Sequence, residues 1–199
     1  MATPLSPPNT LATASGVVAS FWRSAVSFDS VSLPSAPGVM PSAARLSGWP
    51  AASPLTRARD TAAPIALRLG LTPRYEADLR EYHLGEWEGV TYADLAREHR
   101  LFERMQADPD WQPGGGESAR QVAERLAGRL GAISAAHAGE RVIVVTHGGA
   151  LTLGLGWLLD RDVSTWRRVM HNGAVSDLVF DPEPSLLCFD EVAHLEGLA

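Results

Sequence analysis

A histidine followed by two glycines stands at the end of an apolar run in the second half of the chain. Residues 142–145 are all β-branched and carry no polar break, which is typical of a strand buried on both faces of a parallel sheet. His147 follows this run, and Gly148 and Gly149 lead into an apolar helical pattern over residues 150–159. Ligands of open α/β sheets bind at the carboxyl ends of strands, beside the next helix. We therefore expect His147 to face a ligand, the alternative being a structural histidine in the turn.

Two further segments carry side chains suited to chemistry on an anion. Arg57 and Arg59 are two residues apart on an expected helix, so they point to different faces, and one can reach a site at the helix start. Residues 80–89 contain three glutamates, one histidine and two glycines, which indicates a loop able to present a carboxylic acid. The alternatives are a surface charge for the arginine and a solvated acidic turn for the loop.

Helices and strands must alternate to position these side chains. The first expected helix has Ser53 as its N-cap and Pro54 as its first residue, and it ends at Gly70. A second helix is expected over 91–105, and a third from the capping box at Ser118 to about Leu130. Two strands, 174–180 and 186–190, are expected to be joined by a turn. This alternation over 53–190 predicts an α/β protein, a three-layer α/β/α sandwich with a mostly parallel central sheet.

Composition excludes several classes of protein. With 199 residues, 45% of them hydrophobic and 20% charged, one globular domain with a proper core is expected. The net charge of −6 argues against binding to nucleic acid or to an anionic membrane. The single cysteine, Cys188, rules out an internal disulfide and fits a reducing compartment, so we expect a cytoplasmic protein. No apolar run is long enough to span a membrane.

Residues 1–50 differ from the rest of the chain. Half of them are serine, proline or alanine, with one acidic residue, Asp29, two basic residues, Arg23 and Arg45, and no histidine. The apolar patch at 16–28 is compatible with either a helix or a strand. We interpret residues 1–50 as an atypical segment, either disordered or divergent, and residues 51–199 as the domain.

The motifs together resemble the histidine phosphatase superfamily, also called phosphoglycerate-mutase-like. They are Ser-Pro-Leu-Thr-Arg-Ala at 53–58 with Thr-Ala at 61–62, Leu-Arg-Glu at 79–81 with Gly-Glu-Trp-Glu-Gly at 85–89, Gly-Gly-Glu-Ser at 115–118 and Thr-His-Gly-Gly at 146–149. Each motif is weak alone, but all four occur in the family's order and spacing, from about residue 53 to 180. The sequence at 85–89 is more similar to the small phosphatase branch than to the glycolytic mutases.

The resemblance implies a phosphoglycerate-mutase-like fold and a role for each matching residue. The family transfers phosphoryl groups through a phosphohistidine, with no metal or organic cofactor. Arg57 would clamp the phosphate, His147 would donate a hydrogen bond to the phosphoryl group, and Glu81 would protonate the leaving oxygen. Ser53 and Gly148 would line the pocket. The expected function is a phosphomonoesterase acting on a small phosphorylated metabolite.

The sequence departs from the family at the nucleophile. The family's attacking histidine lies in an Arg-His-Gly motif on the first strand, but no histidine precedes His83, and neither Arg23 nor Arg45 is followed by one. A shifted reading frame or deep divergence would explain how residues 1–50 replace that strand and motif. Two hypotheses therefore stand: a phosphatase, or an inactive relative that binds phosphorylated ligands or a partner protein. The substrate and the oligomeric state are not readable from the sequence.

Overall fold

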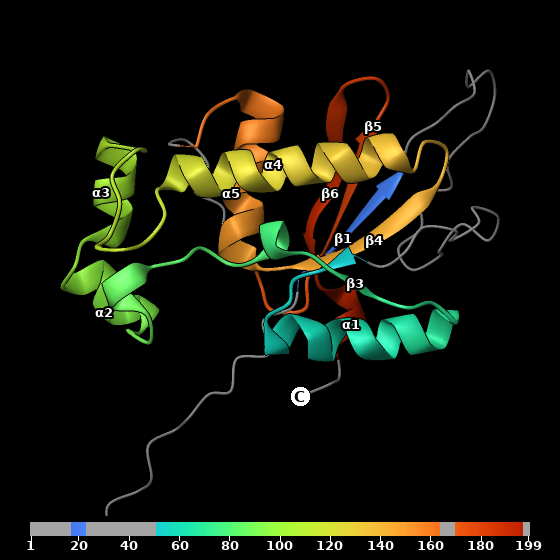
Figure 1. Ribbon diagram of the computed structural model, residues 1–199, viewed down its shortest axis with the longest axis horizontal. Coiled ribbons are helices and arrows are strands. Elements are labelled where there is room, and N and C mark those ends of the chain that lie inside the picture. The colour runs from blue at the N-terminus through green and yellow to red at the C-terminus, as the bar shows by residue number, and fades with distance from the viewer. Residues whose placement is uncertain (1–16, 23–50, 164–169, 197–199) are drawn as a thin grey trace, which may run out of the picture.

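The computed structural model describes residues 17–22, 51–163 and 170–196, which form one twisted sheet with helices on both faces (Figure 1). The sheet has six strands in the order β3-β2-β4-β1-β5-β6. The strands are β1 (Val17–Trp22), β2 (Ala51–Ala52), β3 (Arg74–Tyr75), β4 (Arg141–Thr146), β5 (Val175–Phe180) and β6 (Pro184–Glu191). The helices are α1 (Thr56–Leu69), α2 (Tyr92–Arg97), α3 (Leu101–Ala107), α4 (Ala119–Ala136) and α5 (Gly148–Asp160), with 3-10 turns at Ala77–Leu79, Gly85–Trp87 and Ala193–Leu195. The predicted α/β sandwich is confirmed.

Strand β4 lies at the centre of the fold, and its two faces pack against different layers. Val142 and Val144 belong to the core beneath α4 and α5, whereas Ile143 and Val145 pack with the alanines of α1. Successive residues of a strand point to opposite faces. Since both faces are covered, all four side chains are buried. The expectation of a strand covered on both sides is confirmed.

Strand β1 resolves the choice left open for residues 16–28, because Val17–Trp22 form a strand. It lies between β4 and β5, antiparallel to the former and parallel to the latter. Val17 pairs with Thr146, and Trp22 pairs with Arg141 at the other end. Three of the five neighbouring pairs in the sheet are parallel. The rest of the segment 1–50, and our interpretation of it as disordered or divergent, lies outside the described residues.

Two helix predictions need correction. Helix α1 begins at Thr56 with Leu55 as N-cap, because Ser53 instead extends the sheet by donating its main-chain N–H to the carbonyl of Val145, 2.8 Å away. The helix expected over 91–105 is two helices, α2 and α3. They are separated at Arg100, whose φ of 52° is incompatible with a continuous helix.

The predicted end of α1 and the predicted start of α4 are confirmed, whereas α4 and β6 are longer than predicted. Gly70 ends α1 in the left-handed conformation, with φ of 67°. Ser118 caps α4 in a complete capping box with Gln121, and the helix runs on to Ala136. Strands β5 and β6 flank the expected turn, which is shorter than predicted because β6 already begins at Pro184. None of the helices in the described part of the chain is long and apolar enough to cross a bilayer.

Helices α4 and α5 pack closely on the sheet face opposite α1 (Figure 1). A Cβ atom on Gly154 of α5 would come within 2.7 Å of Leu126 Cδ2 on α4. The glycine therefore sets how near the two helices approach. Helices α2 and α3 stand at the end of the molecule where α1 and α5 begin (Figure 1).

Candidate functional site

The predicted site residues meet where β2 and β4 end and α5 begins. Ser53 follows β2, Arg57 lies in the first turn of α1, His147 follows β4, and Gly148 opens α5. Glu81 comes from the loop after the 3-10 turn at Ala77–Leu79 and contacts the same end of α5. Parallel strands β2 and β4 run in the same direction, so their carboxyl ends share one edge of the sheet, as expected for a ligand site in this fold class.

His147 is held between an arginine and a serine. Arg57 Nε donates to His147 Nδ1 at 3.2 Å, and His147 Nε2 lies 2.7 Å from Ser53 Oγ. An arginine nitrogen can only donate, so Nδ1 is the acceptor and Nε2 carries the hydrogen of the neutral ring. His147 thus presents an N–H donor at Nε2, where its partner is the Ser53 hydroxyl oxygen.

The charge state of His147 follows from its surroundings. The side chain is fully buried, and burial, followed by the positive charges of Arg57 and Arg125, lowers its pKa to about 3. Both causes disfavour the imidazolium form. The ring is therefore neutral at pH 7, which is compatible with the tautomer imposed by Arg57.

Glu81 occupies the amino end of α5. Its carboxylate accepts hydrogen bonds from Ala150 N at 2.7 Å and Gly149 N at 3.3 Å, and Oε1 also accepts from Tyr82 N at 2.9 Å. Gly149 and Ala150 are the second and third residues of α5, whose N–H groups have no partner within the helix. Glu81 satisfies them from another segment and lies at the positive end of the helix dipole.

Opposing effects act on the protonation of Glu81. Desolvation by burial raises its pKa, while the three main-chain hydrogen bonds and the charge of Arg57 lower it, and burial dominates. The residue as a whole is half-buried, but its carboxyl group is the part packed against α5. A carboxyl group whose pKa lies above its usual value is suited to donate a proton.

The absence of a side chain at Gly149 leaves room for the Glu81 carboxyl group, which lies against it. A Cβ atom there would come within 2.9 Å of Glu81 Oε1, closer than real Cβ atoms approach a neighbour. Arg59, in contrast, points away as expected and lies over the ring of Tyr75 at 4.8 Å. The two arginines of the motif therefore separate, and only Arg57 contacts His147.

Sequence reasoning missed several residues that hold the site. Thr146 Oγ1 donates to the carbonyl of Leu79 at 2.8 Å, which ties the end of β4 to the Glu81 segment. The sequence motifs include Glu117 only within Gly-Gly-Glu-Ser at 115–118, and they do not include Arg125. Arg125 forms a bidentate ion pair with Glu117. Glu117 lies before the N-cap of α4 and eight residues before Arg125, so the helical i,i+3 and i,i+4 spacings do not reveal this contact.

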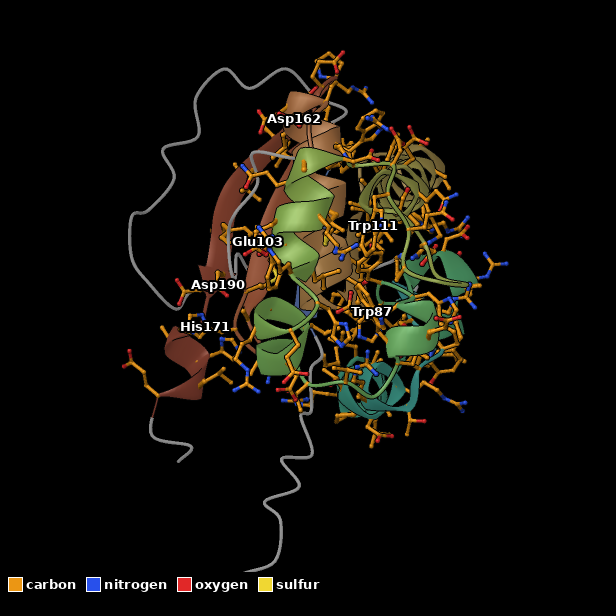
Figure 2. The ribbon with its side chains drawn as sticks, turned by 90° about the vertical axis from the view of Figure 1, so that its left-hand side faces the viewer. Trp87, Glu103, Trp111, Asp162, His171 and Asp190 are labelled. Atoms are coloured by element: carbon orange, nitrogen blue, oxygen red, sulfur yellow. The ribbon has the colours of Figure 1, made fainter. Side chains whose placement is uncertain are left out.

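Aromatic side chains gather near α2 and α3. Trp87 and Trp111 lie close together (Figure 2), with ring centroids 5.4 Å apart, and His99 packs on Trp87 at 4.5 Å. Both tryptophans are half-buried against the main core. They belong to the loops next to the site end of the molecule.

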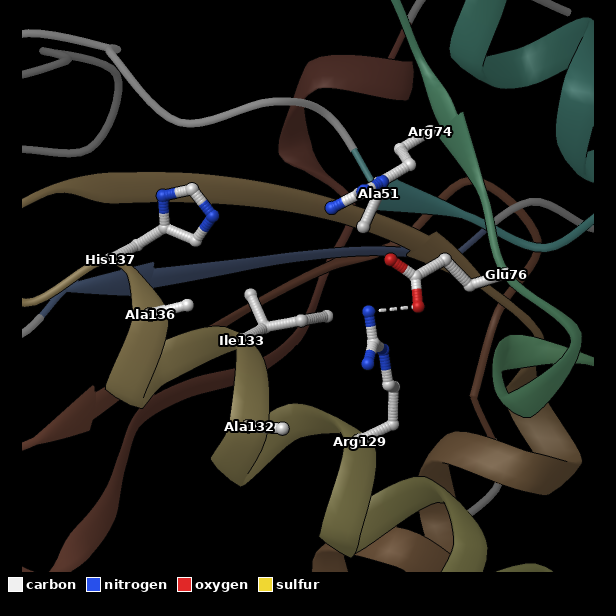
Figure 3. Close-up of a pocket in the computed structure, with 8 residues that line it drawn as sticks. All are labelled: Ala51, Arg74, Glu76, Arg129, Ala132, Ile133, Ala136 and His137. Carbon is white, nitrogen blue, oxygen red and sulfur yellow. Dashed lines mark ion pairs between the residues drawn. The ribbon is translucent and has the colours of Figure 1, made fainter.

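A separate cavity of about 230 Å³ lies between β2, β3 and the second half of α4 (Figure 3). It is lined by Ala51, Arg74, Glu76, Arg129, Ala132, Ile133, Ala136 and His137. None of the predicted site residues lines it, and the Arg129–Glu76 ion pair crosses it (Figure 3). We therefore place the candidate site at the start of α5.

Comparison with known proteins gives relatives with similar sequences. The chain is 39% identical over 153 residues to phosphoglycerate mutase-like protein 4 of Arabidopsis thaliana, covering 72% of this chain and 64% of the relative. It is 38% identical over 125 residues to glucosyl-3-phosphoglycerate phosphatase of Mycobacterium tuberculosis, covering 57% and 55% respectively. The chain thus spans between half and two thirds of the length of these curated relatives.

Solved structures agree with the sequence comparison. The mycobacterial glucosyl-3-phosphoglycerate phosphatase in complex with inorganic phosphate superimposes with a TM-score of 0.63 at 29% identity, over 73% of this chain and 77% of that one. Residues 42–187 match branch 1 of the histidine phosphatase superfamily. This match covers most of the chain, and the chain belongs to the histidine phosphatase superfamily.

Proposed function

We propose that the protein is a phosphomonoesterase that hydrolyses a small phosphorylated metabolite. The observation that carries the proposal is the convergence of Arg57, His147, Ser53 and Glu81 at the start of α5. A relative with the same fold is a phosphatase crystallised with inorganic phosphate. A dianionic phosphoryl group suits a pocket that combines a guanidinium, a neutral N–H donor and a carboxylic acid.

Each side chain has one task in this proposal. The Arg57 guanidinium and His147 Nε2–H bind phosphoryl oxygens, with the Ser53 hydroxyl and the backbone at Gly148 completing the pocket. Glu81, whose pKa is raised, donates its proton to the oxygen of the departing alcohol. Phosphoryl transfer depends mostly on positioning and on charge stabilisation, so this set provides what the reaction needs apart from the nucleophile.

The nucleophile decides how fast such an enzyme works. The superfamily's route is a phosphohistidine, which here would form on one of the six histidines of the chain. His147 is poorly suited, because its Nδ1 accepts from Arg57 and its Nε2 carries hydrogen. Loss of a covalent nucleophile cost about 10⁶ in rate in one well-studied protease. Mass spectrometry after incubation with a phosphodonor tests for a phosphohistidine.

The missing nucleophile favours a second candidate, an inactive relative that binds phosphorylated ligands or a partner protein. No histidine precedes His83, and the family match begins at residue 42. Strand β1 runs antiparallel to β4, so the residue of β1 that lies beside Thr146, at the site end of β4, is Val17 and not a histidine. The pocket residues outside the nucleophile are retained, so such a protein would still bind phosphate.

Hydrolysis of p-nitrophenyl phosphate, measured with binding of inorganic phosphate by calorimetry, separates the candidates. The enzyme is supported if turnover is lost in His147→Ala and kept in His137→Ala, a matched deletion outside the site. The inactive relative is supported if the wild type binds phosphate but does not hydrolyse the ester, and if His147→Ala abolishes the binding. A wild type that neither binds nor hydrolyses overturns both.

The proposed setting is a reducing compartment, the cytoplasm, since the chain has a single cysteine. The proposed ligand is a small metabolite, and the net charge of −6 disfavours nucleic acid as a partner. The loops that carry Trp87 and Trp111 are the proposed determinants of which phosphate ester enters. A panel of sugar phosphates and phosphoglycerate derivatives tests this selectivity.

A further inference from the structure

The backbone that carries Glu81 is held on both sides by one ion pair. We propose that Arg125 and Glu117 are positioning residues that fix residues 78–83 so that the Glu81 carboxyl group faces the phosphoryl-binding side chains. This inference rests on the proposed function, because it assigns the pair to the proton donor of that same site. Within the described part of the chain, neither residue forms a hydrogen bond or an ion pair with Arg57, Ser53 or His147. The charge of Arg125 also acts on His147 from a distance, but the contacts of the pair are with the segment that carries Glu81.

Arg125 holds the side of the segment that precedes Glu81. Its Nη1 donates to the main-chain carbonyls of Asp78 at 2.8 Å and Arg80 at 3.1 Å. The intervening carbonyl, that of Leu79, accepts from Thr146. Three consecutive carbonyls are therefore fixed, two by α4 and one by the end of β4. A segment held in this way has little freedom to rotate the next side chain.

Glu117 holds the side that follows Glu81. Its Oε2 accepts from His83 N at 3.2 Å, and its own main-chain N–H donates to the carbonyl of His83 at 2.8 Å. Two residues further on, Gly85 fits against the backbone of Gly114, where a Cβ atom would come within 2.0 Å of the Gly114 carbonyl oxygen. The loop after Glu81 is thus packed on the loop that presents Glu117.

The ion pair itself joins these two anchors. Arg125 Nε and Nη2 donate to the two carboxylate oxygens of Glu117, each at 2.9 Å. Both side chains are largely buried, with 13% and 23% exposed. The planar guanidinium serves the carboxylate on one edge and two carbonyls from Nη1, a set of partners that a lysine ammonium cannot reproduce. Arg125→Lys therefore keeps the charge and removes the geometry.

The chain supplies a matched control one turn further along α4. Arg129 forms an ion pair with Glu76 (Figure 3), and Glu76 lies before the 3-10 turn, outside residues 78–83. Arg129 and Arg125 are four residues apart on one helix face. Arg129→Lys thus makes the same chemical change to an ion pair of the same helix without touching the carbonyls next to Glu81.

Leaving-group dependence provides a readout that general destabilisation would not change. A departing alkoxide needs its proton far more than p-nitrophenolate does, so a displaced proton donor lowers kcat for an alkyl ester selectively. For Arg125→Lys we expect the ratio of kcat on glycerol 3-phosphate to kcat on p-nitrophenyl phosphate to fall by about tenfold or more, with KM nearly unchanged. Glu117→Gln, a second variant of the same shape, should act in the same direction. Arg129→Lys should leave the ratio at the wild-type value.

A titration of Glu81 keeps the test valid if the wild type hydrolyses neither ester. Carbon-13 NMR of the Glu81 carboxyl carbon, assigned with Glu81→Gln, reports the position of this group without any turnover. A freed segment lets water reach the carboxyl group, so the Glu81 midpoint should move towards that of an ordinary glutamate in Arg125→Lys and remain in place in Arg129→Lys. An inactive wild type with this pattern overturns the phosphatase but keeps the positioning role.

Three outcomes would overturn the positioning role itself. The first is equal loss of activity on both esters in Arg125→Lys, and the second is a Glu81 midpoint that stays at the wild-type value in both Arg125→Lys and Glu117→Gln. The third is a shift of the same size in Arg129→Lys, because it would show a general effect of loosening α4.

Discussion

Arg57 Nε donates to His147 Nδ1 across 3.2 Å, although the two residues are 90 positions apart in the sequence. This single contact fixes which imidazole nitrogen carries hydrogen, and so which group faces Ser53. The arginine therefore serves two purposes in the proposed function, as a ligand of the phosphate and as the residue that orients the histidine.

Arg57→Lys should release this control of the histidine tautomer. A lysine keeps the positive charge but lacks the planar fork, so we expect His147 to show a mixture of tautomers and phosphate binding to weaken by about 10- to 100-fold, equivalent to one charge-assisted hydrogen bond. Long-range proton–nitrogen NMR of the imidazole measures the tautomer, and calorimetry measures the affinity. An unchanged Nε2–H tautomer in the variant would contradict this prediction.

The pH dependence of stability should report the buried His147. Its folded-state pKa of about 3 lies below the value of an unfolded histidine, so its contribution is fully present above about pH 6.5 and is lost as the pH falls towards 3. Between pH 7 and pH 4 the wild type should lose on the order of 3 kcal/mol more unfolding free energy than His147→Gln, which has no titrating ring. Urea unfolding of both proteins at the two pH values measures the difference. Parallel losses would show that His147 does not titrate in this way.

Gly149→Ala should disturb the contact between α5 and Glu81. The new methyl group would lie 2.9 Å from Glu81 Oε1, and overpacking of this kind costs about 1–3 kcal/mol of unfolding free energy. Gly128→Ala is the control, since a Cβ atom there meets nothing within 4 Å on helix α4, and alanine should stabilise that helix by about 0.5–1 kcal/mol. Opposite signs for the two substitutions in urea unfolding are the expected result.

Tyr82→Phe should stabilise the protein. The Tyr82 hydroxyl is buried and has no hydrogen-bond partner among the residues that the structure describes, and burial, followed by the charge of Glu117, raises its pKa to about 12. Removing an unpaired buried hydroxyl should add about 1 kcal/mol to the unfolding free energy. Tyr75→Phe, at a site that is 41% exposed, should change it by less than about 0.5 kcal/mol. A destabilised Tyr82→Phe would show that the hydroxyl has a partner.

Much of the fold follows from local sequence signals. The apolar run of β4 and the capping box at Ser118 specify their elements directly, because burial and capping depend on neighbouring residues. Ser53 misled the prediction, since a serine before a proline is typical of a helix cap, whereas here its backbone pairs with Val145 and its hydroxyl with His147. Those partners lie about 90 residues away, and no local pattern reveals them.

The site was predictable to a different extent. Arg57, Glu81 and His147 were found through motifs shared with a family, and the structure brings all three to one end of α5. Their supporting contacts were not found, because Arg125 binds main-chain carbonyls, and a carbonyl has no signature in the sequence. The direction of β1 was equally hidden, since an apolar strand reads the same whichever way it runs.

The close approach of α4 and α5 at Leu126 and Gly154 affects how the Glu81 carboxyl group keeps its orientation. Leu126 is the neighbour of Arg125 on α4, and Gly154 lies one turn after Ala150 on α5. Helix α4 binds the main chain beside Glu81 through Arg125, and α5 donates main-chain hydrogen bonds to the Glu81 carboxylate. Because Gly154 lets the two helices pack closely, we expect these two sets of contacts to move together, so that thermal motion displaces the Glu81 carboxyl group and the backbone beside it as one unit.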